Sequence, residues 1–363
     1  MNVFVRQFIT VSAVVTTTAA CAQRQVQSAA GDSAPVIQGA AGRADSNESR
    51  HLTDIRKITN GGENAEAYFS RDGQRLIFQS TRDGRTCDQQ YTMKLDGSDL
   101  KRVSPGQGKT TCGYYMDGDS RILFASTHAV DTACPPRPDP SQGYVWGLDP
   151  FDIYVSNADG SALRRLTKFG VYTAEGTLSP DGKRIVFTSL KDGDLDIYTM
   201  NVDGTDLKRL TNTPGYDGGP FFSPDGKQIV YRAWHPTDST LATYQALLKK
   251  RMVHPSRMEI FVMNADGTNQ RQITQLGGAN FAPFFTPNGK QIIFSSNHPS
   301  PRSRNFDLYL VNTDGTGLEQ VTFDGEFDGF PMFSPDGRSI VWASNRGNAR
   351  DSHSTNLFLA RWK

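Results

Sequence analysis

The chain has 363 residues, of which 37% are hydrophobic and 21% charged, so it is long enough to bury a substantial core. Its 39 lysines and arginines nearly balance 38 aspartates and glutamates, which excludes the strong positive field typical of nucleic-acid-binding proteins. The 34 glycines, 19 prolines and short apolar runs favour many strands joined by tight turns over long helices.

Residues 1–20 have the features of an export signal. Arg6 supplies positive charge, and residues 8–15 form an apolar stretch that is too short to span a bilayer. Thr18-Ala19-Ala20-Cys21 resembles a bacterial lipobox, which implies that Cys21 is lipidated and becomes the mature N-terminus. Ordinary cleavage after Ala20 or Ala22 is the alternative. Because Ala22 stands where Asp would retain a lipoprotein at the inner membrane, we expect a periplasmic protein anchored to the outer membrane.

Residues 21–53 are expected to form a tether. They are rich in Ala, Gly, Ser and Gln and nearly free of large apolar side chains, so they cannot bury enough surface to fold. The predicted folded domain therefore runs from Asp54 to Lys363.

The rest of the chain repeats one pattern, which is clearest in residues 174–211. This unit reads as four strands with Ser179-Pro180-Asp181-Gly182 between the first two. Such a sequence suits a tight hairpin, because Pro presets the backbone, Asp tolerates the next position, and Gly takes the positive φ that closes the turn.

Counterparts of this turn recur in five further units. They are Arg71-Asp72-Gly73, Asp117-Gly118-Asp119, Pro224-Asp225-Gly226, Pro287-Asn288-Gly289 and Pro335-Asp336-Gly337. The spacing of about 45 residues is typical of four-stranded propeller blades. The sequence therefore predicts an all-β, six-bladed β-propeller of antiparallel blades, with a solenoid of the same units as the alternative.

The two ends of the repeat region favour the closed ring. The last unit supplies a third strand in residues 356–363 and leaves no residues for a fourth. The missing outer strand is present at the other end, where Arg56-Lys57-Ile58-Thr59 matches outer strands such as Lys208-Arg209-Leu210-Thr211. We expect residues 54–59 to pair with the C-terminal strand, which would close the ring and remove its exposed edges.

These repeats resemble the TolB-type, WD40-like propeller family, on the recurring patterns Ser-Pro-Asp-Gly-Lys-x-Ile-Val-Phe and Asp-Ile-Tyr-x-x-Asn-x-Asp-Gly. The resemblance implies a propeller that binds an envelope protein, but such propellers host binding proteins and enzymes alike. The α/β domain that precedes the propeller in TolB has no counterpart here, so we assign no partner-binding residues from the resemblance.

Two long insertions are expected on one face of the ring, which we take as the candidate working face. Residues 129–150 are rich in proline and include Tyr144 and Trp146, which would either anchor a partner or pack on their own blade. Residues 236–257 read as a short helix, capped by Asp238 or Ser239, that lies on the propeller as a partial lid.

Each unit places a basic side chain after its second strand. The six residues are Arg82, His128, Lys191, His235, His298 and Arg346. They would form a ring that holds an anion, or the three histidines would share a metal. Alternatively, each would pair within its own blade with the acid that opens the third strand, namely Asp152, Asp196, Glu259 or Asp307. We favour this second interpretation.

Carboxylates are also expected near the axial opening. Glu66, Glu175, Asp217 and Asp328 lie at or just before the innermost strands, where side chains can point into the channel. They would bind a cation or a basic segment of a partner, or bond to backbone amides of the blade connections. No cofactor is predicted, although a divalent metal in the axial channel is compatible with these residues.

Three cysteines follow Cys21, which predicts one disulfide and one remaining thiol in an oxidising compartment. The preferred pair is Cys87 with Cys112, linking neighbouring blades. The pair of Cys112 with Cys134 is the alternative.

The predicted function is a non-catalytic scaffold for an envelope protein. The chain is expected to be a monomer, to reach the membrane only through its lipid anchor, and to bind no nucleic acid. No Gly-x-Ser-x-Gly motif is present, and the catalytic residues of any activity stay unknown. One alternative is a metal-assisted sugar lyase or hydrolase, which resemblance to other propellers suggests, with His128, His235, His298 and Glu175 in its site. A glycan or cell-wall binding module, using Tyr144 and Trp146, is the other.

Overall fold

The computed structural model describes residues 47–139, 141, 143–348 and 354–363, and these belong to one compact unit, Val36–Lys363. The expected signal peptide, the lipidation site Cys21 and most of the tether lie outside the described residues. Secondary structure begins a few residues before the expected domain start at Asp54, because a 3-10 turn, η1 (Glu48–Arg50), precedes the first strand. No described helix has the length and apolar character needed to cross a membrane.

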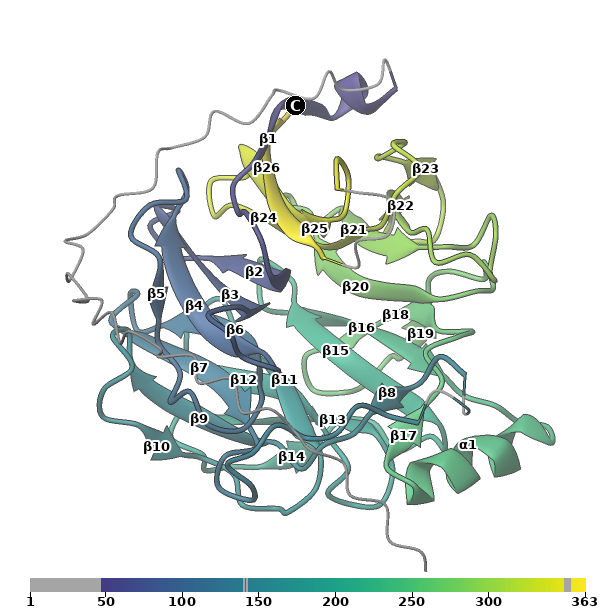
Figure 1. Ribbon diagram of the computed structural model, residues 1–363. Coiled ribbons are helices and arrows are strands. Elements are labelled where there is room, and N and C mark those ends of the chain that lie inside the picture. Colours follow the sequence, from purple (N-terminus) through teal and green to yellow (C-terminus); the bar gives the residue numbers. More distant parts are fainter. Residues whose placement is uncertain (1–46, 140, 142, 349–353) are drawn as a thin grey trace, which may run out of the picture. The chain divides into compact units, whose positions relative to one another are not determined.

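Six four-stranded antiparallel sheets form the blades of a propeller, as the repeats predict (Figure 1). From the axis outward, blade 1 holds β2 (Glu63–Phe69), β3 (Arg75–Thr81), β4 (Gln89–Lys94) and β5 (Lys101–Arg102); blade 2 holds β6 (Thr110–Met116), β7 (Arg121–Ser126), β9 (Asp152–Asn157) and β10 (Arg164–Arg165); blade 3 holds β11 (Thr173–Leu178), β12 (Arg184–Ser189), β13 (Asp196–Asn201) and β14 (Lys208–Arg209).

The other three blades have the same order. Blade 4 holds β15 (Tyr216–Phe222), β16 (Gln228–Trp234), β18 (Glu259–Asn264) and β19 (Arg271–Gln272); blade 5 holds β20 (Asn280–Phe285), β21 (Gln291–Ser296), β22 (Asp307–Asn312) and β23 (Glu319–Gln320); blade 6 holds β24 (Asp328–Phe333), β25 (Ser339–Ser344), β26 (Asn356–Trp362) and β1 (Leu52–Lys57). The insertions add β8 (Trp146–Gly147), α1 (Thr240–Lys249) and β17 (Met252–Val253).

The ring is closed by the two ends of the described chain. In Figure 1 the purple β1 lies beside the yellow β26, and Leu52 pairs with Trp362 in an antiparallel register. The innermost strands contact their neighbours in cyclic order, including β2 with β24. Ile55 is buried in the apolar cluster between blades 5 and 6. The predicted closure is therefore confirmed.

Antiparallel order assigns every loop to one of two faces. The turn face carries the hairpins between first and second strands and those between third and fourth strands. The insertion face carries the loops between second and third strands and the connections between blades. Both long insertions lie on the insertion face.

Every innermost strand contains a β-bulge at the same level of the channel. At each bulge the pairing register shifts, and one residue takes a left-handed conformation, with φ between 50° and 60°. These six residues are Glu66, Cys112, Glu175, Gly219, Ala282 and Phe330. A bulge redirects side chains relative to a regular strand. The bulges therefore form one ring of positions around the axis.

Candidate functional site

The two insertions join to form a cap over the insertion face. We use the name cap for the described parts of residues 129–150 and 236–257. Trp146 of β8 pairs with Val253 of β17, so the two segments form a small antiparallel sheet beside α1 (Figure 1). Tyr244 and Leu247 are buried on the inner side of α1, as expected of a partial lid. Two segments separated by about 100 residues in sequence thus pack together on Leu195 and Tyr216 of blades 3 and 4.

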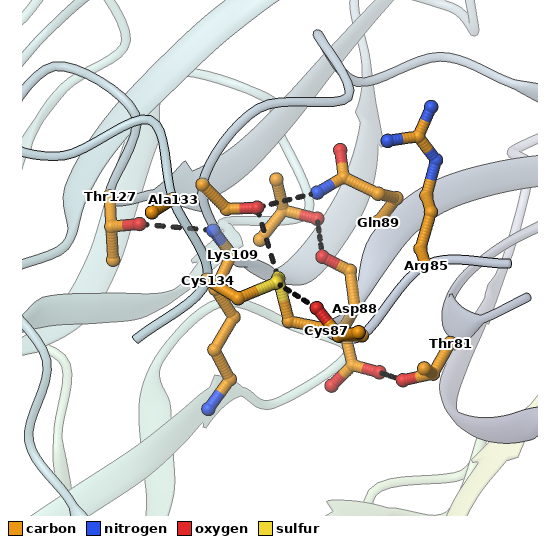
Figure 2. The surroundings of a disulfide bond; sticks show 12 residues. Thr81, Arg85, Cys87, Asp88, Gln89, Lys109, Thr127, Ala133 and Cys134 are labelled. Carbon is orange, nitrogen blue, oxygen red and sulfur yellow. Dashed lines mark hydrogen bonds between the residues drawn. A yellow bond between two sulfur atoms is a disulfide. The ribbon is translucent and has the colours of Figure 1, made fainter. Parts of the chain in front are cut away.

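A disulfide fastens the cap to blade 1, and it differs from the expected pair. Cys87, in the loop after β3, is bonded to Cys134 with the two Cα atoms 5.8 Å apart (Figure 2). Cys112 is a buried free thiol. Both expected pairs were wrong because Cys112 occupies the bulge of β6 and lines the channel, whereas Cys87 and Cys134 lie on loops of the insertion face.

The channel half beneath the cap is a small polar chamber. A cavity of about 30 Å³ is lined by Glu66, Cys112, Glu175 and Arg232 among others. The Arg232 guanidinium forms an ion pair with Glu175 and donates to the Tyr216 hydroxyl at 2.6 Å. Gly219 makes room for this guanidinium, since a Cβ there would lie 2.0 Å from Arg232 Nη1.

The chamber has little space for a ligand, and its titratable side chains are either paired or shifted toward their neutral forms. Burial raises the pKa of Glu66 to about 7, and its Oε2 has no hydrogen-bond partner. Burial also raises the pKa of the Cys112 thiol, so this thiol is neutral at physiological pH. A cavity of this size holds about one water molecule. Glu175 is already paired with Arg232, so the chamber does not fit the divalent metal that the sequence left open.

The channel is blocked below the chamber by aromatic rings. Tyr68 of blade 1 and Phe221 of blade 4 come from opposite sides of the ring, yet their ring centroids are 5.8 Å apart. Tyr114 lies against Tyr68, and Phe284 lies against Phe221. Among the described residues, these rings therefore separate the chamber from a second cavity on the other side of the channel.

The six basic residues after the second strands pack on aromatic side chains. In five blades the basic group lies over the aromatic ring of the third strand, at 4.4 Å for His128 over Tyr154 and 4.7 Å for His298 over Tyr309. The corresponding pairs are Arg82 with Tyr91, His235 with Phe261, and Arg346 with Phe358. Lys191 instead lies over Phe169 and pairs with Asp192. Each basic group thus has an internal packing role.

We expected these basic groups to pair with the acids that open the third strands, and this was wrong because both sets of residues have other partners. Asp152 and Asp196 pair with Arg165 and Arg209 of the fourth strands. Two basic groups pair instead with an acid of their own innermost strand: His235 with Asp217 at 2.9 Å, and Arg346 with Asp328 at 2.7 Å. Asp217 and Asp328 are therefore buried partners within blades 4 and 6, and of the four expected channel carboxylates only Glu66 and Glu175 line the chamber.

The three histidines are not gathered into a metal site. Among the described residues, the one group of three or more His, Cys, Asp or Glu side chains with ligand atoms within 4.8 Å consists of Asp307, Asp324 and Asp328. Arg346 bonds to two of these carboxylates, and burial raises the pKa of Asp307 and of Asp324 to about 7. This group lies between blades 5 and 6. It contains Asp328, one of the four carboxylates expected to bind a cation, but none of the three histidines.

The turn face carries a larger cavity that we call the funnel. It has a volume of about 330 Å³, and the side chains at the channel blockage, including Tyr114, Phe221 and Phe284, form its floor. Its rim consists of the turn residues of the blades, including Pro180, Pro224, Pro287 and Pro335. The charged residues that line it are Arg71, Asp117 and Asp119. The funnel is thus an apolar, dead-ended pocket with a rigid rim.

Sequence reasoning placed the working surface on the insertion face and missed the funnel. Trp146 lies in the cap, with its ring over Arg232 and its edge toward Phe281, whereas Tyr144 is 68% exposed. That these two residues contact a partner stays a prediction. The signal for the funnel was present in the three Pro-Asp-Gly turns and their three variant counterparts, since these six first hairpins lie at one end of the axis.

Comparisons with known proteins agree with this architecture. The TolB beta propeller domain family (PD40) matches residues 149–241 and 233–357. A structure assigned as TolB from Agrobacterium tumefaciens superposes with a TM-score of 0.58 at 19% identity, covering 85% of this chain and 97% of that one. No curated protein matches the chain.

Two enzymes share the same fold. A gluconolactonase from Xanthomonas campestris has a TM-score of 0.57 at 14% identity, covering 86% of this chain and 91% of that one. An oligogalacturonate lyase in complex with manganese has a TM-score of 0.50 at 14% identity, covering 85% and 93%. Structural similarity at such low sequence identity establishes the fold alone. The function has to be inferred from the residues of the site.

Proposed function

Because the family matches together span residues 149–357, more than half of the chain, the protein belongs to the TolB beta propeller family, and we propose that it is a non-catalytic scaffold that binds an envelope protein through its funnel. The observation that carries this proposal is the funnel itself, a rigid apolar pocket of about 330 Å³ that opens on the turn face.

The shape of the funnel suits an anchor side chain of a protein. Interfaces draw most of their binding energy from a few apolar or aromatic residues buried in preformed pockets near the interface centre. The funnel offers aromatic rings as a floor and prolines as a rim, so little ordering is needed on binding. Its few charged residues do not favour a strongly charged ligand. We therefore commit to an apolar side chain of a protein partner as the occupant.

We place this scaffold in the periplasm, attached to the outer membrane through lipidated Cys21. The lipobox-like sequence Thr18-Ala19-Ala20-Cys21 supports the anchor. The Cys87–Cys134 disulfide supports an oxidising compartment, since structural disulfides are rare in the bacterial cytosol.

The geometry gives less support to an activity on sugars. The lyase hypothesis needs His128, His235 and His298 to act together, but each packs on an aromatic ring of its own blade. Glu175, its candidate carboxylate, is held by Arg232 in a chamber with room for about one water molecule. The glycan-binding alternative keeps only Tyr144 as an exposed aromatic contact, because Trp146 is part of the cap.

Site-directed photocrosslinking in intact cells tests the proposal. A photoreactive amino acid at Pro180 probes the funnel, one at Tyr144 probes the insertion face, and one at Leu163, on the outer edge of the turn face, is the matched control. We expect one envelope protein to be attached at Pro180, saturably and without attachment at Leu163. Attachment of that protein at Tyr144 in place of Pro180 would show that the partner binds the opposite face.

A further inference from the structure

The insertion between β16 and β18 of blade 4, which contains α1, is rich in positive charge. Residues 236–257 contain four Lys and Arg residues, namely Lys249, Lys250, Arg251 and Arg257, against the single acid Asp238, a net charge of +3 where the whole chain has +1. Lys249, Arg251 and Arg257 are exposed, and no carboxylate of the described residues forms an ion pair with any of them. Asp238 is the carboxylate whose charge interacts with Arg257. Exposed positive charge of this density attracts an anionic surface.

Two of these arginines occupy backbone positions that disfavour them. Arg251 has φ 56° and Arg257 has φ 68°, in the left-handed region where glycine carries no penalty. The backbone of Arg251 is fixed there, because its carbonyl accepts a hydrogen bond from Leu148 N–H in the other half of the cap. Both arginines are exposed and form no ion pair with a described carboxylate, so their charge is accessible to a ligand outside the chain.

The same surface extends on both sides of this segment. On one side His254 donates to the carbonyl of Tyr144, whose side chain is 68% exposed. On the other side Met258 forms an isolated bridge with Ala279, whose N–H donates to Asn297 Oδ1. Asn297 donates in turn to the carbonyls of Pro301 and Ser303. The loop of Pro301 adds the exposed Arg302 and Arg304. We call Tyr144, Lys249, Arg251, Arg257, Arg302 and Arg304 the basic patch.

The start of the described chain reaches this face through the side chain of Glu48. Glu48 is buried, and its carboxylate accepts hydrogen bonds from Phe323 N–H, in a blade connection, and from Arg346, in the loop after β25. Both partners belong to the insertion face. Glu48 therefore fixes the first described residues against segments of this face.

We propose that the basic patch binds the anionic headgroups of a lipid bilayer. Exposed lysines and arginines supply charge complementarity, and an exposed tyrosine beside them is the side chain favoured at the level of the headgroups. This departs from the expectation that the membrane is reached only through the lipid anchor. It does not rest on the funnel, which opens on the opposite face and would be left free for a partner.

Vesicle sedimentation of the full chain carrying Cys21→Ser tests the proposal, because this protein has no lipid. The vesicles are phosphatidylcholine alone or with increasing phosphatidylglycerol. We expect binding that requires phosphatidylglycerol and is lost as salt shortens the Debye length. The variant Lys249→Glu/Arg251→Glu/Arg257→Glu should bind roughly 100-fold more weakly, since each basic residue contributes about fivefold. The charge-matched control Lys183→Glu/Lys227→Glu/Lys290→Glu, on the turn face, should bind like the parent.

A second variant separates binding from folding. Arg251→Gly/Arg257→Gly removes two charges and relieves two unfavourable conformations, so its melting temperature should stay the same or rise while vesicle binding falls roughly 20-fold. Binding without phosphatidylglycerol dependence, or equal loss in the turn-face control, would overturn the proposal. Binding to soluble polyglutamate but not to vesicles would also overturn it, in favour of an acidic protein partner.

Discussion

The indole of Trp146 lies over the guanidinium of Arg232, with Cζ 5.2 Å from the ring centroid. Trp146 belongs to the insertion of blade 2, whereas Arg232 is in β16 of blade 4 and is paired with Glu175 of blade 3. This contact connects the cap to the chamber below it. It also explains why one strongly buried arginine is present in the channel, since its charge is compensated by Glu175 and its upper face is covered by Trp146.

Replacing Trp146 by alanine should loosen the cap and leave the blades intact. A cation–π contact of this kind contributes about 1–2 kcal/mol, so amide exchange at Leu148 and Val253 should accelerate by roughly tenfold. Hydrogen exchange measured by mass spectrometry checks this, with amides of β12 as the internal reference. Trp146→Phe is the matched control and should show a smaller change. Equal exchange rates in the cap of parent and alanine variant would contradict the role of this contact.

Peptide mapping under non-reducing conditions should find Cys87 joined to Cys134. In the chain carrying Cys21→Ser, the one thiol should be Cys112, which reacts with alkylating reagents only after unfolding because it is buried in the channel. Reduction should lower the free energy of unfolding by about 2–4 kcal/mol, as for a typical disulfide. A Cys112-containing disulfide peptide would contradict the described arrangement.

Replacing Glu66 by glutamine should stabilise the protein above neutral pH. Burial raises the pKa of Glu66 from an ordinary value of 4.5 to about 7. Between these two pH values the folded state holds a proton that the unfolded state has lost, so the contribution of Glu66 to stability falls as pH rises and is lost above pH 7. Glutamine has no proton to lose. The gain should be on the order of 2 kcal/mol at pH 8 and near zero at pH 4.

Denaturant unfolding at the two pH values measures this effect. Glu63→Gln, at an exposed position of the same strand, is the control and should show no such pH dependence. A Glu66→Gln variant that is less stable than the parent at pH 8 would show that the ionised carboxylate has a stabilising partner in the chamber.

The fold could be predicted from the sequence because the turn residues, the repeat spacing and the two ends of the repeat region all indicate the same closed ring. Pro-Asp-Gly turns set the first hairpin of three blades and variants of them set it in the other three, and the residues from Arg56 to Thr59 revealed the strand that closes the ring. In a repeat protein these signals recur at a fixed spacing, since every blade makes the same turns. The helix of the second insertion was also predicted, because its apolar residues recur at helical spacing.

The site could not be predicted to the same degree, for reasons of geometry. Five of the six bulge positions are not glycine, so no residue type revealed that Cys112 would line the channel and be unable to reach Cys87. The meeting of Trp146 with Val253 depends on two insertions in different blades. Six basic residues at one repeat position suggested a functional ring, but that position is next to a third-strand aromatic residue in five blades, which gives it a packing role.

Affinity of the funnel for the partner captured at Pro180 tests the central proposal most directly. We predict that Pro180→Asp/Pro335→Asp, which places two carboxylates on the rim, weakens binding at least ~30-fold, as expected for loss of a central anchor. The melting temperature should fall only slightly, because two turn prolines are lost. The control Leu163→Asp/Leu207→Asp, on exposed leucines away from the pocket, should bind like the parent. An unchanged Kd in the rim variant would contradict docking in the funnel.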